Sequence, residues 1–111
     1  MEIKINKKGD VTIIKVIKRL DASNYKIFKE KIHSFSKEDI YFVLDFSELE
    51  FLDSTGLGAI ISSLKYASEK GGDVYIANLQ PKPKMLFEIT RAYKIFNVFD
   101  SVKAAINNFH N

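Results

Sequence analysis

The sequence predicts an α/β fold in which an N-terminal β-hairpin is followed by alternating helices and strands. Two β-forming segments with one turn between them open the chain, and apolar residues then recur at helical spacing in several segments. A continuous apolar run lies between two of those helical segments. Because such alternation is typical of parallel strands joined by crossover helices, we expect four to five strands in a mixed sheet with about four helices.

The first two strands are expected to form the hairpin. Residues 3–6 alternate isoleucine with polar side chains, which is the period of a half-buried strand. Residues 7–10 contain glycine and aspartate and are typical of a turn. Val11–Ile17 is rich in β-branched residues and predicts the second strand. Since so few residues separate the two segments, they can pair as an antiparallel hairpin.

An amphipathic helix and a buried strand come next. Phe28 and Ile32 lie at helical spacing with charged residues between them, which predicts a helix with its apolar stripe on a core. Asp21 or Ser23 is placed to cap this helix. The short run Ile40–Phe46 consists mostly of β-forming residues and is typical of a central strand that is covered on both faces.

The second half of the chain continues the alternation. A helix after residues 53–58 is expected to place Leu57, Ile60, Ile61 and Leu64 on its apolar face and Ser62 and Ser63 on its polar face. Gly71-Gly72 ends it, and residues 73–77 form a further strand. Pro81 and Pro83 begin a helix that carries the apolar residues Met85, Leu86, Ile89 and Tyr93. A short extended piece at residues 96–98 precedes a last helix, which Asp100 or Ser101 caps.

Composition limits the functions that are open to the chain. Its 111 residues are expected to form one domain, 1–111. The absence of cysteine excludes disulfides, cysteine-based zinc sites, iron–sulfur clusters and a cysteine nucleophile. The net charge is only +3 and the basic residues are scattered among acidic ones, so no direct nucleic-acid partner is expected. The longest apolar run, Ile40–Leu44, is far shorter than the ~18 residues of a membrane span, which predicts a cytoplasmic protein without membrane insertion.

The most informative segment is Asp53–Gly58, which reads Asp-Ser-Thr-Gly-Leu-Gly between a predicted strand and a predicted helix. An aspartate or serine there can satisfy free backbone N–H groups at the start of the helix. Glycine in a first helical turn is unusual, since each one weakens a helix by up to ~1 kcal/mol. Two interpretations are open: a capped helix whose glycines pack against the sheet, or a serine that is presented for anion binding or modification.

Catalytic chemistry has little support in the sequence. A serine nucleophile needs an adjacent general base, and neither His33 nor His110 has a partner nearby in the sequence. The chain has no Gly-x-Ser-x-Gly or Gly-Lys-Ser/Thr motif, and its acidic residues lack the spacing of metal ligands. We expect no enzyme activity, no metal and no cofactor. A nucleotide-binding enzyme that uses the glycines and the helix N-terminus is the alternative from another class.

Asp53–Gly58 resembles the signature of STAS domains, and more narrowly that of bacterial anti-sigma-factor antagonists. The resemblance covers nearly the whole chain and includes Arg19–Asp21, Val43–Ser47, Phe51-Leu52, Asp73–Asn78 and Phe99–Ala104. It implies a partner-switching protein. Members of this family bind an anti-sigma factor that is also a serine kinase, are phosphorylated by it at the position of Ser54, and are reset by a serine phosphatase.

The same resemblance implies a surface that contacts the partner. That surface would consist of the loop around Asp21 and the start of the following helix: Asp21, Ser23, Asp53, Thr55, Gly56, Leu57 and Gly58. Alternatives stay open at three of these positions. Leu57 can pack in the core without touching a partner, and Asp21 can cap a helix without touching a partner. Thr55 can replace Ser54 as the phosphate acceptor.

A second function is open within the same family. A stand-alone STAS subunit that binds the ATPase of a lipid-transport complex would use the same fold without a sigma factor. The proteins that co-purify with the chain distinguish the two. The family's antagonists are often acidic and this chain is basic, which leaves the charge of its partner open.

Overall fold

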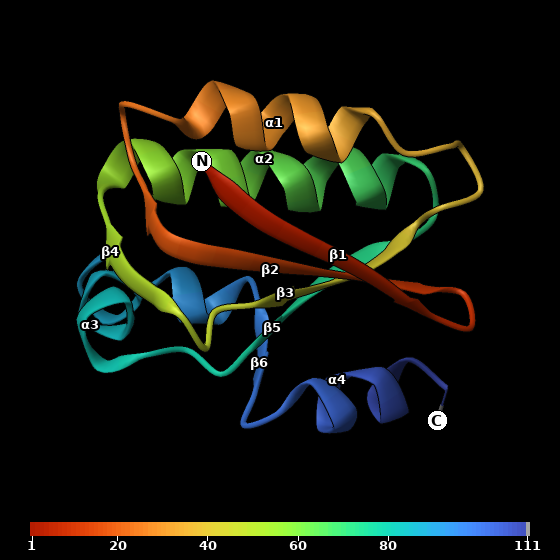
Figure 1. The fold of residues 1–111 in the computed structure, drawn as a ribbon. Coiled ribbons are helices and arrows are strands. Elements are labelled where there is room, and N and C mark those ends of the chain that lie inside the picture. Colours follow the sequence, from red (N-terminus) through yellow and green to blue (C-terminus); the bar gives the residue numbers. More distant parts are fainter. Residues whose placement is uncertain (111) are drawn as a thin grey trace.

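Within residues 1–110, which the computed structural model describes, six strands and four α-helices follow one another as a hairpin and then in alternation (Figure 1). The elements are β1 (Glu2–Lys8), β2 (Val11–Leu20), α1 (Tyr25–His33), β3 (Tyr41–Asp45), β4 (Leu49–Leu52), α2 (Ser54–Glu69), β5 (Asp73–Ala77), α3 (Pro81–Thr90), the 3₁₀ helix η1 (Ala92–Lys94), β6 (Asn97–Phe99) and α4 (Val102–Phe109). The predicted α/β class is confirmed, with one strand more than the four to five expected.

The sheet is mixed, and its strand order is β1-β2-β3-β5-β6. β1 pairs with β2 in antiparallel fashion, which confirms the hairpin. The pairs β2–β3, β3–β5 and β5–β6 are all parallel, as the alternation of helices and strands predicted. The carboxyl ends of these parallel strands therefore lie along one edge, which is where open α/β sheets usually bind their ligands.

The strand missing from the prediction is β4, which pairs with β2 away from the main path of the sheet. Residues 11–15 of β2 pair with β3, and residues 18–20 pair with β4. A shift in register between Lys18 and Arg19 interrupts the pairing with β4, and Lys18 has a φ of 75° there. The expected second strand, Val11–Ile17, was too short because its last residues find a partner only when β4 forms.

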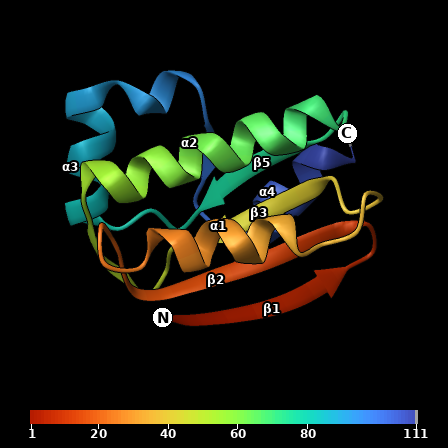
Figure 2. The ribbon, with the colours of Figure 1, turned by 90° about the horizontal axis from the view of Figure 1, so that it is seen from above.

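Helices cover both faces of the sheet. α1 and α2 lie side by side over one face, and α4 lies on the other (Figures 1 and 2). α3 and η1 lie at the end of the sheet where β4 is found, and α3 packs against β4 (Figure 1). This arrangement leaves the beginning of α2 next to the end of β2.

β3 contributes to both apolar cores, which confirms the prediction of a central strand covered on its two faces. Phe42 and Leu44 of β3 are buried with Phe28 of α1 in the larger core, under α1 and α2. Val43 is buried in the smaller core, under α4. There the rings of Tyr75 and Phe109 stack at a centroid separation of 3.8 Å.

Two details of the helices differ from the prediction. α1 starts at Tyr25 with Asn24 as its N-cap, so neither Asp21 nor Ser23 caps it, because residues 22–24 form a turn first. On α2, Ile61 is exposed and Ser63 is buried, the reverse of the expectation. Ser63 belongs to a row of small residues, with Ala59 and Ala67, that is buried where α2 packs on α1 and β5, and its hydroxyl donates to the carbonyl of Ile60.

Candidate functional site

The N-terminus of α2 is fixed by one carboxylate that serves two backbone groups. Asp53 is the N-cap, and its Oδ1 accepts a hydrogen bond from the Gly56 N–H at 2.7 Å. Its Oδ2 accepts from the N–H of Ala22 at 3.0 Å, across 31 positions of sequence. Asp53 therefore both caps α2, as predicted, and holds the loop between β2 and α1 against it.

The loop between β2 and α1 is organised around Asp21, whose side chain is almost fully buried. Its Oδ2 accepts from Nε of Arg19 at 2.7 Å, and its Oδ1 accepts from the N–H and hydroxyl of Ser23. Asn24 closes the loop, since its Oδ1 accepts from the Asp21 N–H at 2.9 Å. The bonds from Ser23, together with Arg19, hold the pKa of Asp21 below its ordinary value, although desolvation opposes them, so the carboxyl is ionised at neutral pH.

The structure brings the two loops together but presents only some of the expected contact residues. Ser54 and Thr55, the first two residues of α2, are exposed, as are Ser23 and Gly58, and Asp53 is partly exposed. Gly56 and Leu57 are buried, and Leu57 belongs to the larger core. Leu57 therefore packs in the core, as one of its two interpretations expected.

The two glycines of the segment have different surroundings. A Cβ built on Gly56 would lie 2.2 Å from the carbonyl oxygen of Leu20 and 2.9 Å from Cδ1 of Leu52. A Cβ built on Gly58 would meet nothing within 4 Å. Close approach to another backbone therefore explains Gly56, whereas Gly58 borders open space one turn along from Ser54.

Arg19 and Phe51 complete this surface, and sequence reasoning assigned neither of them a role. The Arg19 guanidinium lies 5.6 Å from the centroid of the Phe51 ring, and it bonds to Asp21 at the same time. Phe51 is 47% exposed although it sits on β4. The missed strand hid this pair, because only the pairing of β2 with β4 places Arg19 opposite Phe51.

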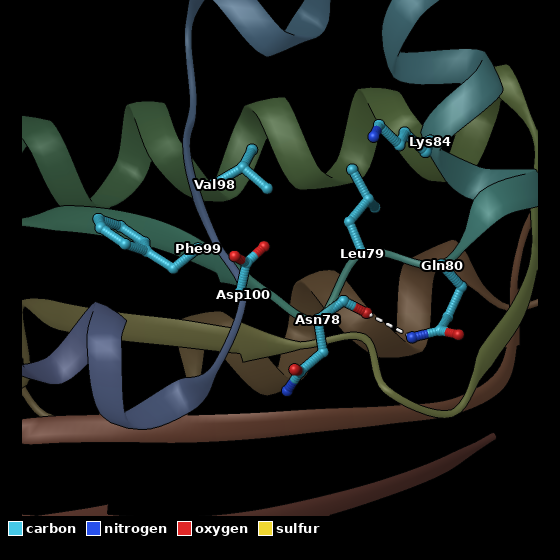
Figure 3. Close-up of a pocket in the computed structure, with 7 residues that line it drawn as sticks. All are labelled: Asn78, Leu79, Gln80, Lys84, Val98, Phe99 and Asp100. Atoms are coloured by element: carbon cyan, nitrogen blue, oxygen red, sulfur yellow. Dashed lines mark hydrogen bonds between the residues drawn. The ribbon is translucent and has the colours of Figure 1, made fainter.

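The loop that follows β5 lies near the segment that follows β3. Residues 80–83 and residues 47–50 line a common hollow of about 400 Å³. A second hollow, of about 260 Å³, lies between the start of α3 and β6, and Figure 3 shows its lining from Asn78 to Asp100. The Asn78 carbonyl accepts there from Nε2 of Gln80 at 2.8 Å.

The described residues form no cluster of side chains that could bind a metal ion. No group of three or more His, Asp or Glu side chains within residues 1–110 is placed to hold a metal ion. In that same part of the chain, none of the helices has both the length and the apolar character needed to cross a membrane.

The chain is a small α/β domain with a mixed sheet in the order β1-β2-β3-β5-β6. Its α2 is capped by Asp53 and presents Ser54 next to the end of β2. The chain belongs to the STAS domain family, whose model matches residues 2–105. The resemblance seen in the sequence is thus confirmed at the level of the family.

Relatives of known name place the chain near anti-sigma factor antagonists. It is 31% identical over 61 residues to the anti-sigma F factor antagonist of Paenibacillus polymyxa, across 55% of this chain and about half (52%) of that relative. It is 24% identical over 85 residues to the anti-sigma-B factor antagonist of Bacillus subtilis, across 77% of this chain and 78% of that one.

Solved structures share the fold. A candidate anti-sigma factor antagonist of Thermotoga maritima aligns with a TM-score of 0.92 at 23% identity, covering 98% of this chain and 95% of that one. The anti-sigma factor antagonist SpoIIAA in its unphosphorylated form aligns with a TM-score of 0.74 at 16% identity, covering 99% of each chain.

Proposed function

We propose that this chain is an anti-sigma factor antagonist that switches partners through the phosphorylation of Ser54. In its unmodified form it binds an anti-sigma factor with serine kinase activity and thereby frees a sigma factor. That kinase phosphorylates Ser54, the complex dissociates, and a serine phosphatase restores the antagonist. The chain is then a substrate and a binding partner, and it has no catalytic role of its own.

One observation carries the proposal: Ser54 is exposed at the first position of α2, next to the open space in front of Gly58. A kinase must enclose the acceptor hydroxyl, so the acceptor needs exposure and room beside it. Thr55 is exposed as well, but it lies one residue further into the helix than Ser54, so Ser54 is the proposed acceptor. The names of the relatives supply the class of partner, an anti-sigma factor.

The local charges explain how a phosphate acts as a switch. Before modification the charged residues that hold the two loops, Arg19, Asp21 and Asp53, sum to a formal charge of −1. A phosphate adds about −1.5 to −2 charges at pH 7, so the surface becomes strongly acidic. The dipole of α2 stabilises this phosphate by roughly 0.3–1 kcal/mol, and repulsion by Asp53 opposes it.

These opposing effects leave the fold nearly unchanged and place the main effect on binding. An unpaired charge forced into a packed interface costs about 2–5 kcal/mol. That free energy corresponds to roughly 30-fold to several-thousand-fold weaker binding. The proposed partner surface is the exposed part of the two loops, with Ser23, Asp53, Thr55 and Gly58 beside the pair of Arg19 and Phe51.

Phosphosite mapping on protein isolated from its native cells, with the co-purifying proteins identified, tests the proposal directly. We expect phosphate on Ser54 and a kinase-like anti-sigma factor in the same sample. Ser54→Ala should retain that partner, and Ser54→Asp should lose it. Ser68→Asp is the matched control, because Ser68 is exposed near the far end of α2 and should not affect binding.

Other results would point elsewhere. An unmodified Ser54 under both growth and stress, together with a transporter ATPase among the co-purifying proteins, would replace the proposal with the accessory-subunit function. Equal binding of the anti-sigma factor by Ser54→Ala and Ser54→Asp would remove Ser54 from the switch.

A further inference from the structure

A second surface lies on α3, η1 and β6, and it is unusually apolar. Ten large apolar side chains are exposed among the described residues, and half of them fall within residues 85–98. We call these five the α3–β6 surface: Met85, Ile89, Tyr93, Ile95 and Val98. Scattered exposed apolar residues are normal in proteins, but such a concentration marks an interaction site. Ile89 is 76% exposed and Met85 is 60% exposed, so neither contributes to the core.

Two residues of this surface, Tyr93 and Val98, also line a groove of about 440 Å³ between α3 and β6. The rest of the groove lining is Leu79, Phe87, Lys84 and Glu88, so Met85, Ile89 and Ile95 lie outside it. The groove shares Leu79, Lys84 and Val98 with the hollow of Figure 3, where Leu79 comes from the loop after β5, Val98 from β6 and Lys84 from α3. The two hollows are therefore neighbours that share part of their lining.

The charges around the α3–β6 surface are mostly positive. Residues 81–100 contain four basic side chains and two acidic ones: Lys82, Lys84, Arg91, Lys94, Glu88 and Asp100. Within the described part of the chain, none of these four basic side chains has a carboxylate within 4.0 Å; the ion pairs lie on other elements, such as Lys7–Asp39 and Lys15–Glu48. Residues 81–100 thus carry a net formal charge of +2. Lys84, Glu88 and Asp100 line the two hollows, and Lys82, Arg91 and Lys94 lie outside these two linings.

We propose that the α3–β6 surface binds an acidic amphipathic helix of a partner protein. Met85 and Ile89 are four residues apart on α3 and form a row of the kind that packs into the groove of another helix. Tyr93 offers the aromatic anchor that is common at the centres of interfaces. The uncompensated lysines and Arg91 select acidic residues on the flank of the partner helix. A second copy of this chain is a poor occupant, because it would bring the same positive charges face to face.

Titration of the isotope-labelled chain with two synthetic peptides tests this proposal by NMR. Both are amphipathic helices of about 18 residues, or five turns, with leucine on one face. One peptide carries glutamate on the other face, and the second carries lysine there. We expect only the acidic peptide to shift the amide signals of residues 82–98, and its affinity should fall as salt is raised.

A matched pair of isoleucine substitutions locates the binding. Ile89→Ser should weaken the acidic peptide about tenfold or more. Ile27→Ser should leave its affinity unchanged, because Ile27 is 49% exposed on α1, away from this surface. Both side chains are solvent-exposed, so neither change should unfold the protein, and thermal denaturation verifies that.

Several results would overturn the proposal. Equal binding of the acidic and basic peptides would reject the charge argument, and signal shifts confined to other elements would reject the location. Binding of anionic phospholipid vesicles that Ile89→Ser abolishes, without any binding of the acidic peptide, would assign the surface to a membrane. Self-association that Ile89→Ser abolishes would assign it to a second copy. None of these outcomes depends on Ser54.

Discussion

Replacing Gly56 and Gly58 by alanine should have opposite effects on stability. The alanine Cβ at position 56 would lie 2.2 Å from the Leu20 carbonyl oxygen, whereas real Cβ atoms stay beyond 3.0 Å. The first turn of α2 must therefore move by about 1 Å from β2, and a backbone carbonyl cannot rotate out of the way as a side chain can. Position 58 has open space, so an alanine there needs no such movement.

The expected magnitudes follow from these contacts. Overpacking costs about 1–3 kcal/mol, and better helix propensity returns up to ~1 kcal/mol. Because the clash at position 56 involves backbone on both sides, we expect Gly56→Ala to lower the free energy of unfolding by about 2 kcal/mol. That change lowers Tm by about 8 °C in a domain of this size. Gly58→Ala should raise the free energy of unfolding by about 0.5–1 kcal/mol, since only the propensity gain applies.

Urea denaturation followed by circular dichroism measures both variants, and thermal melts check the order. A Gly56→Ala protein as stable as the parent would refute the reasoning, because it would mean that α2 does not pack against β2 as closely as described. Gly58→Ala also separates stability from binding. If the open space beside Ser54 admits the kinase, this variant should be phosphorylated more slowly although it is more stable.

Three further predictions concern other polar groups. Asp53→Ala should lower the free energy of unfolding by about 2–3 kcal/mol in urea titrations, more than the ~1 kcal/mol of Ser101→Ala, because Asp53 serves two N–H groups and Ser101 caps only α4. Thr12→Val should raise the free energy of unfolding by about 1 kcal/mol in the same assay. The reason is that the fully buried Thr12 hydroxyl has no hydrogen-bond partner among the described residues. A variant less stable than the parent would show that this hydroxyl does have a hydrogen-bond partner. The lowered pKa of Asp21 means that its contribution to stability is complete above pH 3.8 and is lost as the pH falls through the folded-state pKa. Asp21→Asn should therefore flatten the dependence of stability on pH below about pH 4, and an unchanged slope would contradict the network around this carboxylate.

The order of the elements was predictable from the sequence because each relied on a local pattern. The hairpin, the buried strand β3 and the capped start of α2 all follow from short segments such as Val11–Ile17, Ile40–Phe46 and Asp53–Gly58. The capping role of Asp53 was also local, since an aspartate before a helix bonds to an N–H three residues later.

The parts that could not be predicted depend on contacts distant in sequence. β4 has four residues, of which the two in the middle are exposed, so it shows no alternation that would indicate a strand. Its existence depends on the last residues of β2, and the pairing of Arg19 with Phe51 follows from that. The second bond of Asp53, to Ala22, is equally invisible in a local pattern.

Errors on the helices have a related cause. Helical spacing alone does not say which side of a helix meets the sheet, and α3 shows this most clearly. Phe87 is buried, but Met85 and Ile89, which the sequence presents as equivalent apolar residues, are exposed. Tyr93 lies beyond the end of the helix, because Arg91 turns into the left-handed region with a φ of 61°.

A single residue joins β4 to α2, since the strand ends at Leu52 and the helix begins at Ser54. The connection is therefore too short to adjust: the pairing of β4 with β2 fixes the direction of the α2 axis, and the rotation of α2 about that axis fixes the direction of the Ser54 side chain. One extra residue at this junction would rotate every side chain of α2 by about 100° relative to the sheet. The segment can accept changes of side chain far more readily than changes of length, so in related sequences we expect insertions to accumulate elsewhere.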